Sequence, residues 1–163
     1  MKKSEKEVLD LISHNASLSP AKISQRLNIN EKEIVNIITR LQKTGVIVGY
    51  ETIINWGKTD RDIVSAFIEV KVIPQQSYGF DAIAKQIYLY PEVDSIYLMS
   101  GGFDFAILIE GKSLKDVSSF ISEKLSTLPY IQSTSTHFVL KKYKDHGAIL
   151  EKEKKDPRLL VKA

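Results

Sequence analysis

The sequence predicts an α+β protein in which a small helical domain precedes a domain of mixed strands and helices. Apolar residues recur at helical spacing through residues 1–50, whereas residues 63–143 combine strand-like alternation with two further helical segments. A polar, turn-rich stretch at residues 51–62 separates the two patterns and is expected to be a linker. We therefore expect domains at residues 1–50 and 63–143, followed by a charged tail at residues 144–163.

The N-terminal domain is expected to contain three short helices, two of which meet at a tight corner. Apolar residues at positions 8, 9, 11 and 12 predict the first helix, which closes a core that two helices alone would leave too small. Ser19-Pro20 is typical of a helix start, with Ser as the cap and Pro at the first helical position. In the turn Asn28-Ile29-Asn30, the first Asn tolerates a left-handed backbone and the second favours a new helix start. This pattern predicts a trihelical, winged-helix-like helix-turn-helix domain.

The second helix of the corner, expected over residues 31–43 and ended by Gly45, has two different faces. Positions 34, 37, 38 and 41 are Ile or Leu at helical spacing and are expected to face the core. In a helix-turn-helix the second helix enters the major groove of double-stranded DNA, where Asn, Arg and Thr can bond base edges or phosphates and Val can meet a thymine methyl. The candidate DNA-binding residues are Lys22, Lys32, Val35, Asn36, Thr39, Arg40 and Lys43.

A second interpretation of this corner stays open, namely a helical hairpin that packs on another surface. Glu31 and Glu33 lie at the start of the second helix, where carboxylates stabilise the helix dipole but repel phosphate. Residues 1–60 contain nine Lys/Arg against seven Asp/Glu. Each subunit would therefore contact few phosphates, and DNA binding is expected to depend on several subunits acting together.

The C-terminal domain is expected to have the order β-α-β-β-α-β. Strands are predicted at residues 63–73, 93–99, 103–109 and 131–143, with helices at residues 78–90 and 114–128. This order predicts a ferredoxin-like fold, whose four-stranded antiparallel sheet carries its helices on one face. A second copy of the chain is the expected cover for the other face, which makes a dimer. The apolar strand residues assigned to that contact are Phe67, Tyr97, Phe105 and Phe138.

Several segments occur in one order along nearly the whole chain. They are Asn15-Ala16-Ser17-Leu18-Ser19, the corner, Arg40-Leu41, Gly45-Val46-Ile47-Val48-Gly49-Tyr50 and Ser100-Gly101-Gly102-Phe103-Asp104. In this combination the chain resembles the Lrp/AsnC (feast/famine) family of transcriptional regulators. The resemblance implies assembly into dimers and commonly octamers, with small effectors, usually amino acids, bound at subunit interfaces. Ser17, Asn28 and Gly102 depart from the Arg, Gly and acidic residue that are frequent in the family, and we expect the first to weaken a phosphate contact and the last to alter ligand choice.

The resemblance implies that the effector binds around the Gly101-Gly102 turn. Glycine N–H groups can approach a carboxylate, Asp104 can accept from an ammonium, and threonines on the last strand offer hydroxyls. Two plainer interpretations stay open: Gly101-Gly102 is only a tight β-turn, and Asp104 only fixes it by accepting backbone N–H bonds. The candidate effector-binding residues are Ser100, Gly101, Gly102, Phe103, Asp104, Thr134 and Thr136.

Composition argues against several other classes of protein. The 163 residues are 43% hydrophobic and include no cysteine, which excludes disulfides and thiolate metal sites. His14, His137 and His146 lack metal-ligand spacing, and no nucleophile stands beside a plausible base, so we expect no catalysis, no metal and no cofactor. No apolar run suffices to cross a membrane, and we expect a cytoplasmic protein. The basic residues 152–162 are expected to form either a basic arm or a solvated end.

Two other functions stay open beside the regulator. The first is an architectural DNA-binding oligomer without an effector, and the second is a metabolite-binding or enzymatic ferredoxin-like protein whose helical domain binds another protein. Saturable binding of a small molecule separates the regulator from the architectural oligomer. Loss of DNA binding on substitution of Arg40 separates both DNA-binding functions from the metabolite-binding or enzymatic protein.

Overall fold

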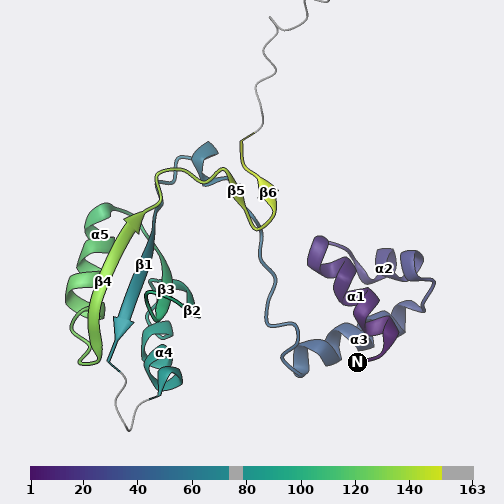
Figure 1. The fold of residues 1–163 in the computed structure, drawn as a ribbon. Coiled ribbons are helices and arrows are strands. Elements are labelled where there is room, and N and C mark those ends of the chain that lie inside the picture. Colours follow the sequence, from purple (N-terminus) through teal and green to yellow (C-terminus); the bar gives the residue numbers. More distant parts are fainter. Residues whose placement is uncertain (74–78, 152–163) are drawn as a thin grey trace, which may run out of the picture. The chain divides into compact units, whose positions relative to one another are not determined.

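The computed structural model describes residues 1–73 and 79–151, and the chain divides into two compact units, Met1–Ile53 and Ile54–Ala163 (Figure 1). The division falls inside the expected linker, so residues 51–53 belong to the first unit and residues 54–62 to the second. A short 3-10 helix, η1 (Trp56–Lys58), lies in the second part of that linker. The basic residues 152–162, expected as an arm or a solvated end, lie outside the described residues.

The first unit consists of three helices, α1 (Lys3–His14), α2 (Pro20–Leu27) and α3 (Glu31–Lys43). Their apolar faces meet in one core, and its fully buried members are Val8, Ile23, Ile34, Ile37 and Leu41. All of residues 1–53 are described and none lies in a strand, so this unit is a trihelical helix-turn-helix without a β wing.

The helix ends of the first unit lie where capping chemistry predicts them. The Ser19 side chain accepts the backbone N–H of the third residue of α2, and Pro20 occupies the first helical position. Asn28 adopts the left-handed conformation, with φ 53° and ψ 44°. The Asn30 side chain accepts an N–H of the first turn of α3 at 2.9 Å, and Gly45, with φ 71°, follows the end of that helix.

The second unit has the predicted β-α-β-β-α-β order and is a ferredoxin-like fold. Its elements are β1 (Val64–Val72), α4 (Phe80–Tyr88), β2 (Val93–Leu98), β3 (Phe105–Gly111), α5 (Leu114–Ser119) and β4 (Ile131–Phe138). The sheet order is β2-β3-β1-β4, and all neighbouring strands are antiparallel. The second predicted helix is divided, because α5 passes into a π-helical segment, η2 (Phe120–Leu125), after which Ser126 N–H bonds the carbonyl of Ile121 five residues back.

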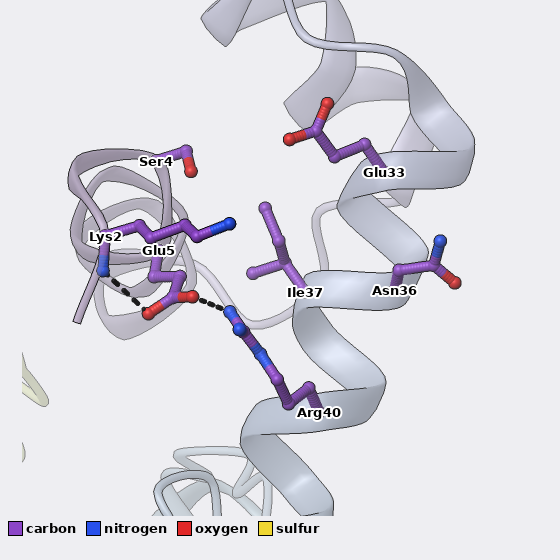
Figure 2. Close-up of a pocket in the computed structure, with 7 residues that line it drawn as sticks. All are labelled: Lys2, Ser4, Glu5, Glu33, Asn36, Ile37 and Arg40. Atoms are coloured by element: carbon purple, nitrogen blue, oxygen red, sulfur yellow. Dashed lines mark hydrogen bonds and ion pairs between the residues drawn. The ribbon is translucent and has the colours of Figure 1, made fainter.

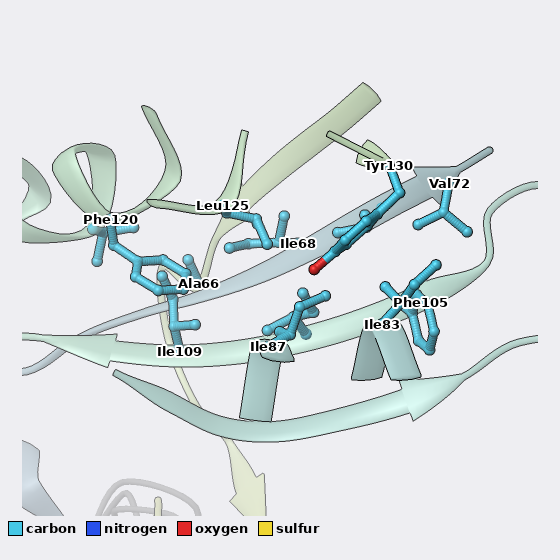
Figure 3. Packing of buried hydrophobic residues seen from close by; sticks show 13 residues of the cluster. Ala66, Ile68, Val72, Ile83, Ile87, Phe105, Ile109, Phe120, Leu125 and Tyr130 are labelled. Atoms are coloured by element: carbon cyan, nitrogen blue, oxygen red, sulfur yellow. The ribbon is translucent and has the colours of Figure 1, made fainter. Parts of the chain in front are cut away.

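The core of the second unit lies between the sheet and its helices (Figure 3). Alternate residues of β1 point into it, as the strand pattern predicts, and both helices contribute Ile, Val or Phe side chains. Phe105 is only 1% exposed and packs edge-on against Phe80, so its assignment to the uncovered face is wrong. Phe138 pairs with the core residue Ala66 and therefore lies on the helix-covered side as well.

The opposite face of the sheet carries a smaller apolar group than expected. Register places Phe67 beside Leu108 of β3 and beside His137 of β4, and the rings of Phe67 and His137 lie 6.1 Å apart. Tyr97, which is 53% exposed, lies on the same face, because it pairs with Ala106, two residues before Leu108 in β3. His137 also lies 3.5 Å from the Glu69 carboxylate. This face therefore combines aromatic and charged side chains.

The chain after β4 does not continue as the long strand that the pattern predicts. β4 ends at Phe138, and a small hairpin of β5 (Lys144–Asp145) and β6 (Ala148–Ile149) follows, with its turn residues in left-handed conformations. Lys142 bonds Glu110 of β3 at 3.0 Å. Burial lowers the pKa of Lys142, but this bond and the nearby carboxylates raise it by more, so the pKa lies above its usual range.

No helix of the described residues is long and apolar enough to cross a membrane.

Candidate nucleic-acid interface and effector region

The turn between α2 and α3 is held closed by Ser24. The Ile29 N–H bonds the Ser24 carbonyl at 3.2 Å, and the Ser24 hydroxyl donates to the Ile29 carbonyl at 2.6 Å. Together with the left-handed Asn28, these bonds turn the chain sharply into the cap of α3. Sequence reasoning missed Ser24, because its only signal is a small hydroxyl residue in the second half of α2. The corner is a helix-turn-helix in its local geometry.

The outward face of α3 carries most of the predicted DNA-binding residues. Ile34, Ile37 and Leu41 are buried, and at 3.6 residues per turn the opposite side of the helix carries positions 32, 36, 39 and 43. All four of these side chains, Lys32, Asn36, Thr39 and Lys43, are exposed. Val35, 43% exposed, lies at the edge of this face. Lys22 is exposed in the first turn of α2. This face presents hydrogen-bonding and cationic groups to solvent.

Arg40 lies on the flank of α3 and points toward α1 rather than straight outward (Figure 2). Its guanidinium forms an ion pair with the carboxylate of Glu5. Sequence reasoning missed Glu5, because the two residues are far apart in the chain and belong to different helices. Substitution of Arg40 alone would therefore leave a buried carboxylate without its cation, and DNA binding and folding would change together.

The candidate effector turn joins β2 to β3. Met99 N–H bonds the carbonyl of Asp104 at 2.8 Å and closes the turn, whose tip consists of Ser100, Gly101 and Gly102, all exposed. Gly101 has φ 148°, a backbone conformation that side-chain-bearing residues rarely adopt. A Cβ at Gly102 would meet no atom within 4 Å. The backbone at the tip is therefore open to an incoming ligand, and only Gly101 is required by the turn itself.

Asp104 fixes this turn to the sheet. Its backbone N–H bonds the Val70 carbonyl at 2.9 Å, and its carboxylate accepts the Val72 N–H at 2.8 Å. The register of β1 with β4 shifts between Lys71 and Val72, so the carboxylate bonds a residue at an irregularity of β1. The structure thus contains a contact of the kind expected if Asp104 fixes the turn, since its carboxylate accepts a backbone N–H. One carboxylate oxygen is used by Val72, and the second has the capacity to accept from a ligand.

The remaining candidate residues are arranged around β1. Phe103 packs edge-on against Phe67, with ring centroids 6.2 Å apart, and so belongs to the helix-free face. Thr134 pairs with Val70 and Thr136 with Ile68, so both half-buried threonines lie on the helix-covered side of the edge strand β4. Val70 thus bonds the Asp104 N–H on one side of β1 and pairs with Thr134 on the other, whereas Thr136 pairs with Ile68, two residues earlier in β1.

Comparison with known proteins identifies the family of the chain. A family model described as the Lrp/AsnC ligand binding domain matches residues 65–149. A curated relative, the uncharacterized HTH-type transcriptional regulator YugG of Bacillus subtilis (strain 168), is 43% identical over 158 residues, which cover 96% of this chain and 95% of that protein. The chain belongs to the Lrp/AsnC family.

Solved structures of Lrp/AsnC proteins share the fold. The transcriptional regulator NMB0573 from Neisseria meningitidis, solved as an L-Met complex, has a TM-score of 0.71 at 19% identity, covering 91% of this chain and 96% of that one. E. coli AsnC has a TM-score of 0.65 at 20% identity, covering 87% and 93%. The predicted combination of a helix-turn-helix with a ferredoxin-like domain is confirmed, and the protein is an HTH-type transcriptional regulator of this family.

The histidines and carboxylates of the described residues form no cluster that could hold a metal ion. His14 contacts the carbonyl and carboxylate of Asp10 one turn earlier in α1, and His146 lies 3.9 Å from Asp145 beside the hairpin turn.

Proposed function

We propose that this Lrp/AsnC regulator reads DNA through Asn36 and Thr39, with Lys32 and Lys43 as phosphate contacts on the same face of α3. The observation that carries the proposal is that these four side chains are exposed on the side of α3 opposite the core, and that α3 is the second helix of a closed helix-turn-helix corner. Asn and Thr can bond base edges, whereas lysines bind phosphate without reading sequence. Val35 lies at the edge of this face and Lys22 in the first turn of α2, where each would add to the contact.

The test begins with duplexes selected from a random-sequence library by the full-length chain. Asn36→Ala should weaken binding to the selected duplex by about 1–3 kcal/mol and relax the sequence preference. Lys43→Ala should weaken binding to all duplexes and reduce the salt slope by about one. Lys115→Ala on α5 removes an exposed lysine from the other unit and is the charge-matched control. Equal losses for Lys43→Ala and Lys115→Ala would contradict the placement of α3.

The second part of the proposal is that the β2–β3 turn binds a small effector of the free amino acid class. The exposed Gly101-Gly102 backbone supplies N–H groups for a carboxylate, and the second oxygen of Asp104 accepts from an ammonium. Ser100, Phe103, Thr134 and Thr136 complete the candidate set, but Phe103 lies on the helix-free face of the sheet and both threonines lie on the helix-covered side. Thr134 is nearer to Asp104 along β1 than Thr136. The L-Met complex of the related regulator supports this ligand class.

Thermal shift against the individual amino acids tests this part. A ligand at about 100 times its Kd stabilises the folded chain by about 2.7 kcal/mol, which is a measurable rise in Tm. Repeating the DNA titration with each hit shows whether the ligand changes DNA affinity. Absence of any shift across the amino acids, in a chain that binds the selected duplex, would favour the architectural DNA-binding protein.

The third part is assembly as a homodimer through the helix-free sheet face, with octamers as the larger assembly. Phe67, Tyr97 and Leu108 lie exposed or half-exposed on this face, where a second copy would cover them. Leu108→Glu should shift the full-length chain toward monomer in sedimentation velocity. Leu114→Glu on α5 is the matched control, since Leu114 is exposed on the helix that covers the opposite side of the sheet. A monomeric wild type, or equal effects of both variants, would contradict this interface.

A further inference from the structure

The contact between the first turn of α1 and the flank of α3 contains a buried carboxylate. Glu5 is 5% exposed, and among residues 1–73 and 79–151 it is the one charged residue that is fully buried. One of its oxygens accepts the Lys2 backbone N–H at 2.9 Å. The other forms the ion pair with Arg40 (Figure 2). The carboxylate thus joins the start of α1 to the helix that carries the proposed DNA-reading face.

Arg40 connects this buried group to the solvent. Half of its side chain is exposed, whereas that of Glu5 is 6% exposed. Arg40 follows Asn36 by one helical turn, so it borders the outward face of α3. A guanidinium has five N–H donors in a rigid fork, and a bond to one carboxylate oxygen leaves others for a second acceptor. Arg40 lines a surface hollow that Lys2 and Asn36 also line.

Stability alone is a weak explanation for this arrangement. Removing the Glu5 carboxylate from water is costly, and buried charges replaced together with their partners by apolar residues of similar volume often leave proteins equally or more stable. A guanidinium whose orientation is fixed in advance loses less conformational entropy when it binds a phosphate or a base edge. The same carboxylate lowers the net positive charge near DNA, which weakens sequence-independent attraction.

We propose that Glu5 is a positioning residue for DNA recognition, which holds the Arg40 guanidinium toward a DNA base edge beside Asn36. This inference rests on the proposed DNA-reading role of α3. Glu5 has two opposite effects on DNA affinity, and only one of them depends on the DNA sequence. Fixed geometry favours the selected sequence, whereas the added negative charge disfavours every sequence. Glu5 therefore raises the ratio of specific to non-specific affinity.

The test compares a duplex selected from a random-sequence library by the wild-type chain with a scrambled duplex of the same composition. Glu5→Gln should lower affinity for the selected duplex about fivefold or more, while affinity for the scrambled duplex stays equal or rises. Glu7→Gln is the matched control, because Glu7 lies on the same helix and pairs with the exposed Lys3 at 3.8 Å. It should leave the ratio of the two affinities unchanged. In an Arg40→Gln background, Glu5→Gln should no longer change the ratio.

A parallel loss of affinity for both duplexes would overturn the inference and leave Glu5 with a structural role alone. An equal change of the ratio by Glu5→Gln with and without Arg40 would overturn it as well. If Glu5→Gln fails to fold by circular dichroism, Arg40→Lys decides, because it keeps the charge pair but loses the fork. It should lower only the affinity for the selected duplex, and equal affinity to wild type would overturn the inference. A folded wild type that enriches no sequence would instead overturn the proposed function, and this inference with it.

Discussion

Replacement of Asp104 separates its contact with the sheet from its proposed contact with an effector. In Asp104→Ala, the N–H of the buried Val72 loses its acceptor. An unsatisfied buried N–H costs about 1–3 kcal/mol, and for a domain of this size each kcal/mol lowers Tm by about 4–8 °C. Asp104→Asn keeps a neutral acceptor for Val72, so its loss should be about 1 kcal/mol, the difference between a charged and a neutral hydrogen bond.

The assay is thermal unfolding of the full-length chain with and without the best amino acid from the screen. We expect the Ala variant to melt well below wild type and the Asn variant to melt slightly below it. If Asp104 also holds the ligand ammonium, the Asn variant loses most of the ligand-induced rise in Tm although its fold is retained. An Ala variant that melts with wild type would refute the stabilising role of the Val72 bond. Full ligand response in Asp104→Asn would leave Asp104 with its structural role alone.

Four further substitutions test particular contacts. Ser24→Ala removes the hydroxyl that bonds the corner, and it should lower the stability of the first unit by about 1 kcal/mol without altering the second, as differential scanning calorimetry can resolve. Gly101→Ala should destabilise the turn by about 1 kcal/mol or more, because its φ is 148°, whereas Gly102→Ala should be nearly neutral by the same measurement. The hydrogen bond from Lys124 lowers the pKa of Glu92 against the opposing effect of burial. Since a lowered folded-state pKa stabilises above the unfolded pKa, Glu92→Gln should destabilise at pH 7, and its difference from wild type in urea titrations should shrink as the pH falls below about 4.

Local chemistry made the helix ends of the first unit predictable from sequence. The caps at Ser19 and Asn30, the left-handed Asn28 and the terminating Gly45 each depend on residues within one turn, so the sequence contains the whole interaction. The inward face of β1 was predictable for the same reason, since side-chain alternation is a property of the single strand.

Interactions between distant segments account for what sequence reasoning missed. Alternation divides a strand into two faces but does not say which face meets the helices, and strand register decided the positions of Phe105 and Phe138. The bond from Val72 to Asp104 joins neighbouring strands, and the ion pair of Glu5 with Arg40 joins two helices. The conversion of α5 into a π-helical segment could not be read from the apolar spacing, because its buried residues Phe120 and Leu125 also fit the inward face of the continuous helix expected over residues 114–128.

The charge of the first unit limits how this regulator can bind DNA. Its acidic residues nearly balance its basic ones, and Arg40 is already paired with Glu5. Lys32 and Lys43 are therefore the main cations on the outward face of α3, and so few phosphate contacts give weak sequence-independent binding for a single unit. On the proposed function, we therefore expect affinity to come from base contacts by residues such as Asn36 and from assembly of several subunits through the second domain, which would raise the effective concentration of each half-site. A change in assembly would alter DNA affinity without any change at α3. A ligand that binds the second unit and changes the assembly would therefore be enough to control DNA binding by the first unit.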